Sequence, residues 1–319
     1  YEKEVFYYQG TKFIDEVERR LVEEMRAYFG CTEVETRTLS GQMSNMAVFS
    51  ALMDWKNRVD RKHEAKRLGY VMNNHIIKGG HLSAQPMGAL HDYIAIDPIT
   101  ERHAIVNFPV CEDNIYKIDV EETKKLIDQY RPELIIFGKS MVLHKEPVAA
   151  IRKFVDEQNI PTTIMYDMAH VLGLVGDYFQ KPFEEGAEIV TGSTHKTFFG
   201  PQRGVIATNW KKEDLKYGLW ETIQSRAFPG SVSNHHLGTQ LGLLIRDEHL
   251  QGPVPEGDNR ERQALRQGPE ETGTGRCGRP RDRLYRDPSG NSLGRLRHGP
   301  RDRGAPGAQQ HNRKLSGYP

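Results

Sequence analysis

The sequence predicts an α/β protein in which helices cover a mainly parallel sheet. Short apolar runs that are typical of buried strands alternate with segments in which apolar residues recur at helical spacing. Strands and helices that alternate in this way form βαβ units, and such units build parallel sheets.

The predicted elements follow one another from residue 12 onward. Apolar residues at helical spacing predict helices over 12–29, 39–55 and 147–159. Short, β-branched apolar runs predict buried strands at 133–138, 162–167, 187–192 and 204–209. The alternation is clearest between residues 133 and 209, so we expect the centre of the sheet there.

Length and charge limit the classes of function. The chain has 319 residues, enough for one large domain or for a large domain with a smaller one. Its net charge of +1 gives no electrostatic reason to expect nucleic acid or a membrane as a partner. No apolar stretch approaches the roughly 20 residues that span a bilayer. We expect a cytoplasmic protein without a metal site, and an incomplete N-terminus because the chain begins at Tyr1 rather than Met.

The composition changes after residue 246. Residues 247–319 are rich in Arg, Gly and Pro, contain a single Lys (Lys314), and lack Phe, Trp, Ile and Met. Such a segment cannot bury a core, so we expect it to be disordered. We therefore divide the chain into a large domain, 1–246, and a tail, 247–319.

Two explanations of the tail remain open. It could be a natural basic tail, since Arg/Gly-rich segments bind nucleic acid. We prefer a single-nucleotide frameshift near residues 245–248. Codons for "DPSGNSL" (287–293) can be chosen that encode an ordinary strand when they are read one base later, and 248–266 can likewise encode an ordinary helix.

A Ser-Gly turn precedes the helix predicted at 39–55. Free backbone N–H groups at the start of a helix, with the positive end of its dipole, form a site for an anion such as phosphate. Gly41 would allow close backbone approach, and the Ser40 hydroxyl can donate a hydrogen bond. Many helices begin with Ser-Gly because Ser caps them, so capping alone is the alternative.

Asp167 ends the strand predicted at 162–167. A buried carboxylate costs free energy unless a cation pairs with it. His170 follows three residues later. An isolated Asp-x-x-His is also typical of a helix-capping Asp beside a core His, and that interpretation stays open.

Lys196 follows the strand predicted at 187–192, within "GSTHKTFFGPQRG" (192–204). A lysine there is usually a solvated charge, but ligands of open α/β sheets bind beyond the carboxyl ends of strands. A phosphate cradle, a strand-end carboxylate and a strand-end lysine are what pyridoxal 5′-phosphate requires. The lysine forms a Schiff base, the carboxylate keeps the ring nitrogen protonated, and the helix start holds the phosphate.

Two stretches, "YDMAHVLGL" (166–174) and "GSTHKTFFGPQRG", resemble the most recognisable motifs of serine hydroxymethyltransferases, fold-type I pyridoxal-phosphate enzymes. Further segments occur in the family's order at 6–18, 40–45, 79–84 and 228–238. The resemblance covers roughly residues 5 to 245 and is closest to the archaeal-type branch. It implies a three-layer α/β/α large domain of the aspartate-aminotransferase type, followed by a small domain that this chain does not properly encode.

The resemblance implies a role for each matching residue. Lys196 would form the Schiff base, Asp167 would pair with the ring nitrogen, and His170 would lie near the phenolic oxygen of the cofactor. His81 would stack on the ring, although by itself it would be read as an ordinary loop residue. The other residues that the resemblance places at the cofactor are Ser40, Gly41 and Gln42 at the phosphate, and Ser140, Ser193 and His195 in the same pocket.

Two further matches imply a homodimer with shared active sites. Tyr7 matches a tyrosine that reaches the substrate site of the neighbouring subunit. Gly230 lies in "FPG" (228–230), which matches a loop that completes the phosphate site of the partner.

The chain departs from the family pattern in four places. Gln42 stands where the family has a second serine, and Arg203 adds a bulky charge next to the lysine segment. The family's catalytic glutamate would precede Tyr1. The arginine that grips the substrate carboxylate would belong to the C-terminal domain, where no residue can be matched to it.

The implied reaction is the interconversion of serine and glycine, with the one-carbon unit passed to a tetrahydropterin of the tetrahydrofolate type. Two alternatives remain. The first is a folate-independent aldolase for β-hydroxy amino acids, similar to threonine aldolase. The second is a truncated, catalytically inactive product.

Overall fold

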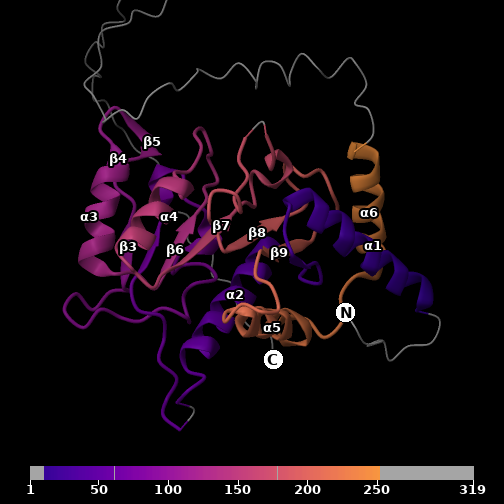
Figure 1. The fold of residues 1–319 in the computed structure, drawn as a ribbon, viewed down its shortest axis with the longest axis horizontal. Helices are drawn as coiled ribbons and strands as arrows, with labels where there is room; N and C mark the ends of the chain where they lie inside the picture. The colour runs from indigo at the N-terminus through magenta and orange to yellow at the C-terminus, as the bar shows by residue number, and fades with distance from the viewer. Residues whose placement is uncertain (1–10, 61, 178, 252–319) are drawn as a thin grey trace, which may run out of the picture. The chain divides into compact units, whose positions relative to one another are not determined.

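Seven strands form one sheet in the order β1–β9–β8–β7–β6–β2–β3 (Figure 1). This computed structural model describes residues 11–60, 62–177 and 179–251, all within the first of two structural units, 1–278. The second unit, 279–319, lies outside the described residues. The strands are β1 (Glu33–Glu35), β2 (Val71–Asn73), β3 (Ile105–Asn107), β6 (Leu134–Phe137), β7 (Thr163–Asp167), β8 (Ile189–Ser193) and β9 (Gly204–Thr208).

Helices lie on both faces of this sheet. They are α1 (Lys12–Phe29), α2 (Gly41–Lys56), α3 (Val120–Tyr130), α4 (Val148–Glu157), α5 (Tyr217–Ser225) and α6 (Leu237–Gln251). Short helical turns occur at η1 (Ile76–Lys78), η2 (Leu82–Ala84), η3 (Leu172–Leu174) and η4 (Arg226–Ser231), and β4 (Val110–Cys111) pairs with β5 (Asn114–Ile118) as a separate hairpin.

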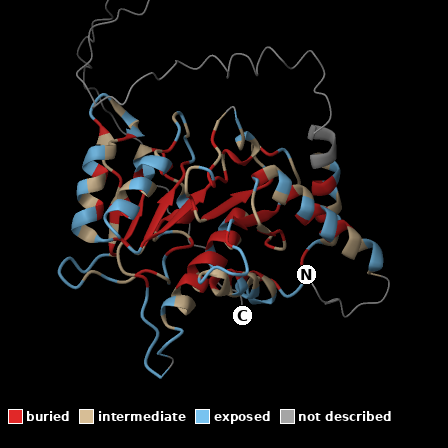
Figure 2. Ribbon diagram, viewed as in Figure 1, coloured by how far each residue is buried: buried red, intermediate tan, exposed pale blue. Residues whose placement is uncertain are grey.

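Two apolar cores hold the layers together. Side chains of α1, α3, α4 and α6 pack on one face of the sheet, and side chains of α2 and α5 pack on the other. In β6, Ile135 and Phe137 enter the first core while Leu134 and Ile136 enter the second. The central strands are therefore buried on both faces, as Figure 2 shows, and they read as continuous apolar runs. The predicted three-layer α/β/α arrangement is confirmed for the described residues.

The predicted central elements are confirmed to within two residues at each end. The helix predicted over 12–29 is α1, and the strand predicted at 162–167 is β7, which begins one residue later. Strands β1, β2 and β3 were not predicted, because a run of three residues is too short to show periodicity.

Strand β9 runs antiparallel to β8, whereas β2, β3, β6, β7 and β8 pair in parallel. Parallel neighbours need a crossover of about a dozen residues or more, usually a helix. Only residues 194–203 separate β8 from β9, and they form no helix. The start of β9 and the end of β8 consequently lie at the same edge of the sheet.

The predicted domain boundary at residue 246 falls inside α6, which continues to Gln251. The remainder of the predicted tail, 252–319, lies outside the described residues.

We expect Gly204→Ala to lower the free energy of unfolding by about 3 kcal/mol, because the added methyl has no space. A Cβ on Gly204 would overlap the carbonyl oxygen of Ser40 and the hydroxyl of Ser44, and would lie 2.5 Å from Thr38 Oγ1. Urea denaturation measures the change. Gly238→Ala is the control, since a Cβ there meets no atom within 4 Å. Equal stability of the two variants would contradict the packing argument.

Candidate active site

The carboxyl ends of β7 and β8 bring the predicted aspartate and lysine to the same edge of the sheet. Asp167 is the last residue of β7 and is paired with Thr191 of β8. Lys196 follows the end of β8 by three residues. Since β1 and β2 end at this edge too, the segments that follow them, with Ser40 and His81, converge on the same place.

Asp167 is buried and accepts four hydrogen bonds. Oδ2 accepts from His81 Nδ1 at 2.6 Å, from Asn45 Nδ2 at 2.8 Å and from Ser83 Oγ at 3.0 Å. Oδ1 accepts from the backbone N–H of Ala169 at 3.1 Å. Burial raises the pKa of Asp167, but the charge and hydrogen bond of His81, with the other donors, lower it below the ordinary value. The carboxylate is therefore held charged, with His81 as its main partner.

Lys196 is half-buried and donates to Ser193 Oγ at 2.6 Å. Burial lowers the pKa of the Lys196 amine, and the charge of Asp167 opposes that shift. Ser193 Oγ in turn donates to the carbonyl oxygen of Ala169 at 3.2 Å. The serine thus connects the lysine to the segment after Asp167. A lysine with a lowered pKa has more of its amine in the neutral, nucleophilic form.

The start of α2 faces the end of β8. The Ser40 side chain caps the helix, accepting from the backbone N–H of Met43 at 3.1 Å, so the capping interpretation of this serine is confirmed. Its hydroxyl proton remains available to a further acceptor. A Cβ on Gly41 would lie 3.3 Å from Gly192 and from Ser193 Cβ. The first turn of α2 therefore lies close to the lysine segment, and Gln42 in that turn is exposed.

His170 and His195 flank this edge. The rings of His170 and His81 meet edge to face, with centroids 5.0 Å apart. Burial, reinforced by the charges of His81 and Lys196, lowers the pKa of His170 to about 4. His195 is exposed, and burial and the charge of Lys196 lower its pKa. At neutral pH the His170 imidazole is therefore uncharged and can accept or donate a hydrogen bond.

Two predicted residues, Ser140 and Gly230, lie outside this cluster, and a third is not described. Ser140 is exposed, and its backbone N–H donates to the carbonyl oxygen of Gly79 at 2.7 Å, which places it beside the His81 loop. Gly230 is exposed in η4, at the end of α5. Tyr7 lies outside the described residues.

The expectation that Arg203 places a bulky charge near the lysine is wrong. The Arg203 side chain is fully buried, and its Nε donates to the carbonyl oxygen of Thr36 at 3.0 Å. Its Nη1 donates to Thr239 Oγ1 at 2.7 Å, toward the start of α6. The guanidinium is therefore directed to the connection between β1 and α2 and to the start of α6.

Three residues at the site were missed from the sequence. Asn45 and Ser83 bind Asp167, and Thr191 Oγ1 donates to Asn45 Oδ1 at 2.6 Å, which orients the amide. Asn45 could have been found, because it is a polar residue in the apolar helix that follows the Ser-Gly turn. A buried amide needs hydrogen-bond partners, so its position there indicates a polar neighbour. Ser83 and Thr191 carry no comparable signal.

The donor set fits pyridoxal phosphate. His81 Nδ1, the N–H of an aromatic ring, donates to Asp167 where a pyridine N–H would donate, and thus stands in for that nitrogen. The half-buried Lys196 amine lies near enough for the Asp167 charge to act on it. The start of α2 supplies N–H groups for a phosphate. For the ring nitrogen to reach Asp167, the His81 side chain would have to rotate away.

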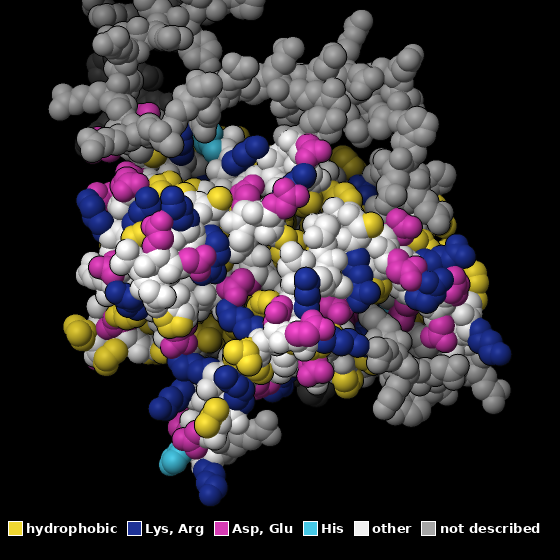
Figure 3. Space-filling model, viewed as in Figure 1, with side chains coloured by type: hydrophobic (Ala, Val, Ile, Leu, Met, Phe, Trp, Pro, Cys, Tyr) yellow, Lys and Arg dark blue, Asp and Glu magenta, His cyan; other side chains and the backbone are white. Residues whose placement is uncertain are grey.

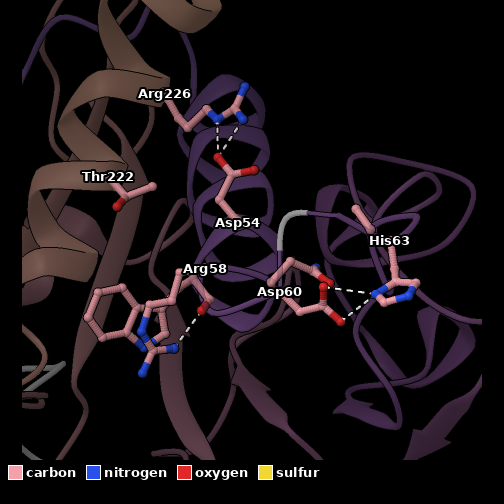
Figure 4. A pocket seen from close by; sticks show the side chains of 9 residues that line it. Asp54, Arg58, Asp60, His63, Thr222 and Arg226 are labelled. Carbon is pink, nitrogen blue, oxygen red and sulfur yellow. Dashed lines mark hydrogen bonds and ion pairs between the residues drawn. The ribbon is translucent and has the colours of Figure 1, made fainter.

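A separate hollow of about 570 Å³ lies at the other end of α2, against α5 (Figure 4). Its charged side chains already pair with one another: Arg226 with Asp54, and His63 with Asp60 at 2.8 Å. The Arg58 guanidinium covers the Trp55 ring at 3.8 Å from the centroid. Among the described residues that line the hollow, both aspartates are therefore already paired, and Arg58 is held against Trp55.

Among the residues that the structure describes, no group of three or more His, Cys, Asp or Glu side chains could hold a metal ion. Within 11–251, apart from 61 and 178, no helix is both long and apolar enough to cross a bilayer. On the face visible in Figure 3, acidic and basic side chains are interspersed.

We expect the protein to lose stability between pH 6.5 and pH 4, in part through His170. The unfolded imidazole takes up a proton near its ordinary pKa of 6.5, but the folded one does so only near 4. The unfolded state therefore binds more protons in this range, and stability falls as the pH falls. The difference between wild type and His170→Asn in urea midpoint should shrink from pH 7 to pH 4. A difference that does not change with pH would contradict the assignment.

Comparison with known proteins identifies the family. Residues 4–242 match the family model of serine hydroxymethyltransferase. The chain is 36% identical over 240 residues to a serine hydroxymethyltransferase of Archaeoglobus fulgidus, covering 75% of this chain and 48% of that protein. It is 37% identical over 239 residues to a serine hydroxymethyltransferase of Methanocaldococcus jannaschii, covering 75% of this chain and 49% of that protein. The chain spans about half the length of these curated relatives. This chain belongs to the serine hydroxymethyltransferase family.

Proposed function

We propose that this chain carries the pyridoxal-phosphate site of an enzyme that interconverts serine and glycine. The hydroxymethyl group would pass to a tetrahydropterin carrier of the tetrahydrofolate type. The observation that carries the proposal is the pair formed by buried, charged Asp167 and half-buried Lys196 at neighbouring strand ends, where Ser193 links the lysine to the Ala169 carbonyl. Membership of the family supports the same reaction.

Each residue of the site has a task that follows from its surroundings. When bound, pyridoxal phosphate supplies an aldehyde for amino groups and a ring that accepts electrons. The Lys196 amine, made less basic by burial, would attach to it. Asp167 would hold the proton at the ring nitrogen, since its pKa is kept low. Asn45, Ser83 and the Ala169 N–H would keep that carboxylate in place.

The remaining residues would bind and orient. The N–H groups at the start of α2, with Ser40, Gly41 and Gln42, would hold the phosphate. Neutral His170 and the displaced His81 ring would pack on the cofactor, while Ser140 and His195 would lie at the rim. We extend the proposal to a cytoplasmic homodimer, in which Tyr7 and Gly230 of each subunit complete the site of the other.

We also propose that the large domain ends near residue 246 and that a frameshift produces the tail. The match to the family model ends at residue 242, and the chain covers only about half of its relatives. Sequencing the source DNA around codon 246 tests this. A single-base change should restore a long open frame, and its absence would contradict the hypothesis.

The test of the site is covalent capture of pyridoxal phosphate by the chain. After reduction with borohydride, the cofactor should be found by mass spectrometry on the peptide that contains Lys196, and Lys196→Ala should capture none there. Lys216→Ala, which removes a surface lysine paired with Glu188, is the matched control and should behave as wild type. Labelling of other lysines instead would contradict the proposal.

The test of the reaction compares the chain as printed with one whose reading frame is restored. Serine cleavage should depend on tetrahydrofolate, and cleavage without it would indicate the aldolase. Asp167→Ala should lower turnover at least about 100-fold while weakening cofactor binding much less, because the carboxylate acts on a proton rather than on the phosphate. Full activity of Asp167→Ala would refute its role, and no activity with either chain would support an inactive product.

A further inference from the structure

Arg203 is a fully buried arginine whose side chain joins three segments of the chain. Its Nε donates to the carbonyl oxygen of Thr36, between β1 and the start of α2, at 3.0 Å. Its Nη1 donates to the carbonyl oxygen of His236 at 2.6 Å and to Thr239 Oγ1 at 2.7 Å, at the start of α6. The arginine itself ends the segment that carries Lys196.

The backbone of Arg203 closes the Lys196 segment at its base. The Thr194 N–H donates to the Arg203 carbonyl oxygen at 3.0 Å, and the Arg203 N–H donates to Thr194 Oγ1 at 3.1 Å. Inside this loop, the Gly200 N–H donates to the Thr194 carbonyl oxygen at 2.7 Å. Lys196 lies two residues after Thr194, so a shift at the base of the loop moves the lysine.

A buried guanidinium is an unusual way to begin a strand. Desolvating it costs several kcal/mol, and its fixed planar donors recover that cost only in one geometry. An apolar side chain would bury the start of β9 without this cost. What the arginine adds is directional: the carbonyl groups of Thr36 and His236 fix where residue 203 can lie.

We propose that Arg203 is a positioning residue that holds the Lys196 amine at the cofactor, and that it couples this position to the start of α6. This inference rests on the proposed function of Lys196. The chain of contacts runs from Thr239 and Thr36 through Arg203 to Thr194, and from there to Lys196 and its acceptor Ser193.

The test separates capture by the lysine from binding of the phosphate. With pyridoxal phosphate, the Lys196 amine condenses with the aldehyde carbon, a C=N bond forms and water leaves, and the rate is followed by absorbance. Pyridoxamine phosphate has an amine in place of the aldehyde and cannot react with lysine. Its affinity, measured by fluorescence titration, therefore reports the rest of the site.

Arg203→Gln should slow capture by about 10- to 100-fold, the usual effect of misplacing a reacting group, and leave the affinity for pyridoxamine phosphate nearly unchanged. Arg203→Lys, which cannot reproduce the planar donors, should recover only part of the rate. Arg152→Gln is the matched control. It removes another poorly exposed arginine, which lies on α4 and pairs with Asp156 and Glu188, and should lower stability without slowing capture.

Thr239→Val tests the positioning role of Arg203 if Arg203→Gln does not fold. It removes one acceptor of the guanidinium from a half-buried position and should slow capture in the same direction, by a smaller factor. Normal capture by the folded variants, or an equal loss of capture and of pyridoxamine phosphate affinity, overturns this inference alone. Failure of the wild-type chain to capture cofactor on Lys196 overturns the proposed function and, with it, this inference.

Discussion

The buried carboxylate of Asp167 is the constraint on which the rest of the site depends. A charge with so little exposure survives only where several donors meet it, and four do. Asn45 lies on α2, His81 and Ser83 lie in the segment after β2, and Ala169 lies just after β7. Keeping one aspartate ionised therefore fixes the relative positions of three segments that are distant in sequence.

The other half of the site depends on close backbone approach. Gly41 at the start of α2 lies against Gly192 and Ser193, and Gly204 lies against the carbonyl of Ser40. These contacts bring the first turn of α2 up to the lysine segment, and the reversal of β9 places the end of that segment at the same edge. Glycine is needed at these positions because any side chain would push the segments apart.

Arg203 connects the lysine segment to the start of α6. Its partners lie in the connection between β1 and α2 and at the start of α6, and its backbone closes the lysine loop. A further buried pair lies nearby, with His235 Nε2 at 3.2 Å from Glu18 Oε1 of α1. Burial and the charge of Arg203 lower the pKa of His235 to about 4, so this histidine is neutral where the arginine is charged.

The fold class, the central strands and helices, and the candidate residues of the site follow from the amino-acid sequence alone. Buried parallel strands leave continuous apolar runs, and Lys196, Asp167 and the Ser-Gly turn stand out because polar groups at strand ends need a reason. The short strands, the partners of Asp167 and the direction of the Arg203 side chain required the folded structure. Strands of three residues are too short to show a periodic pattern. Two partners of Asp167 lie 86 and 122 positions away in the sequence, and the side chain of residue 203 could face either side of the chain. Such choices are made by long-range packing, which no local pattern records.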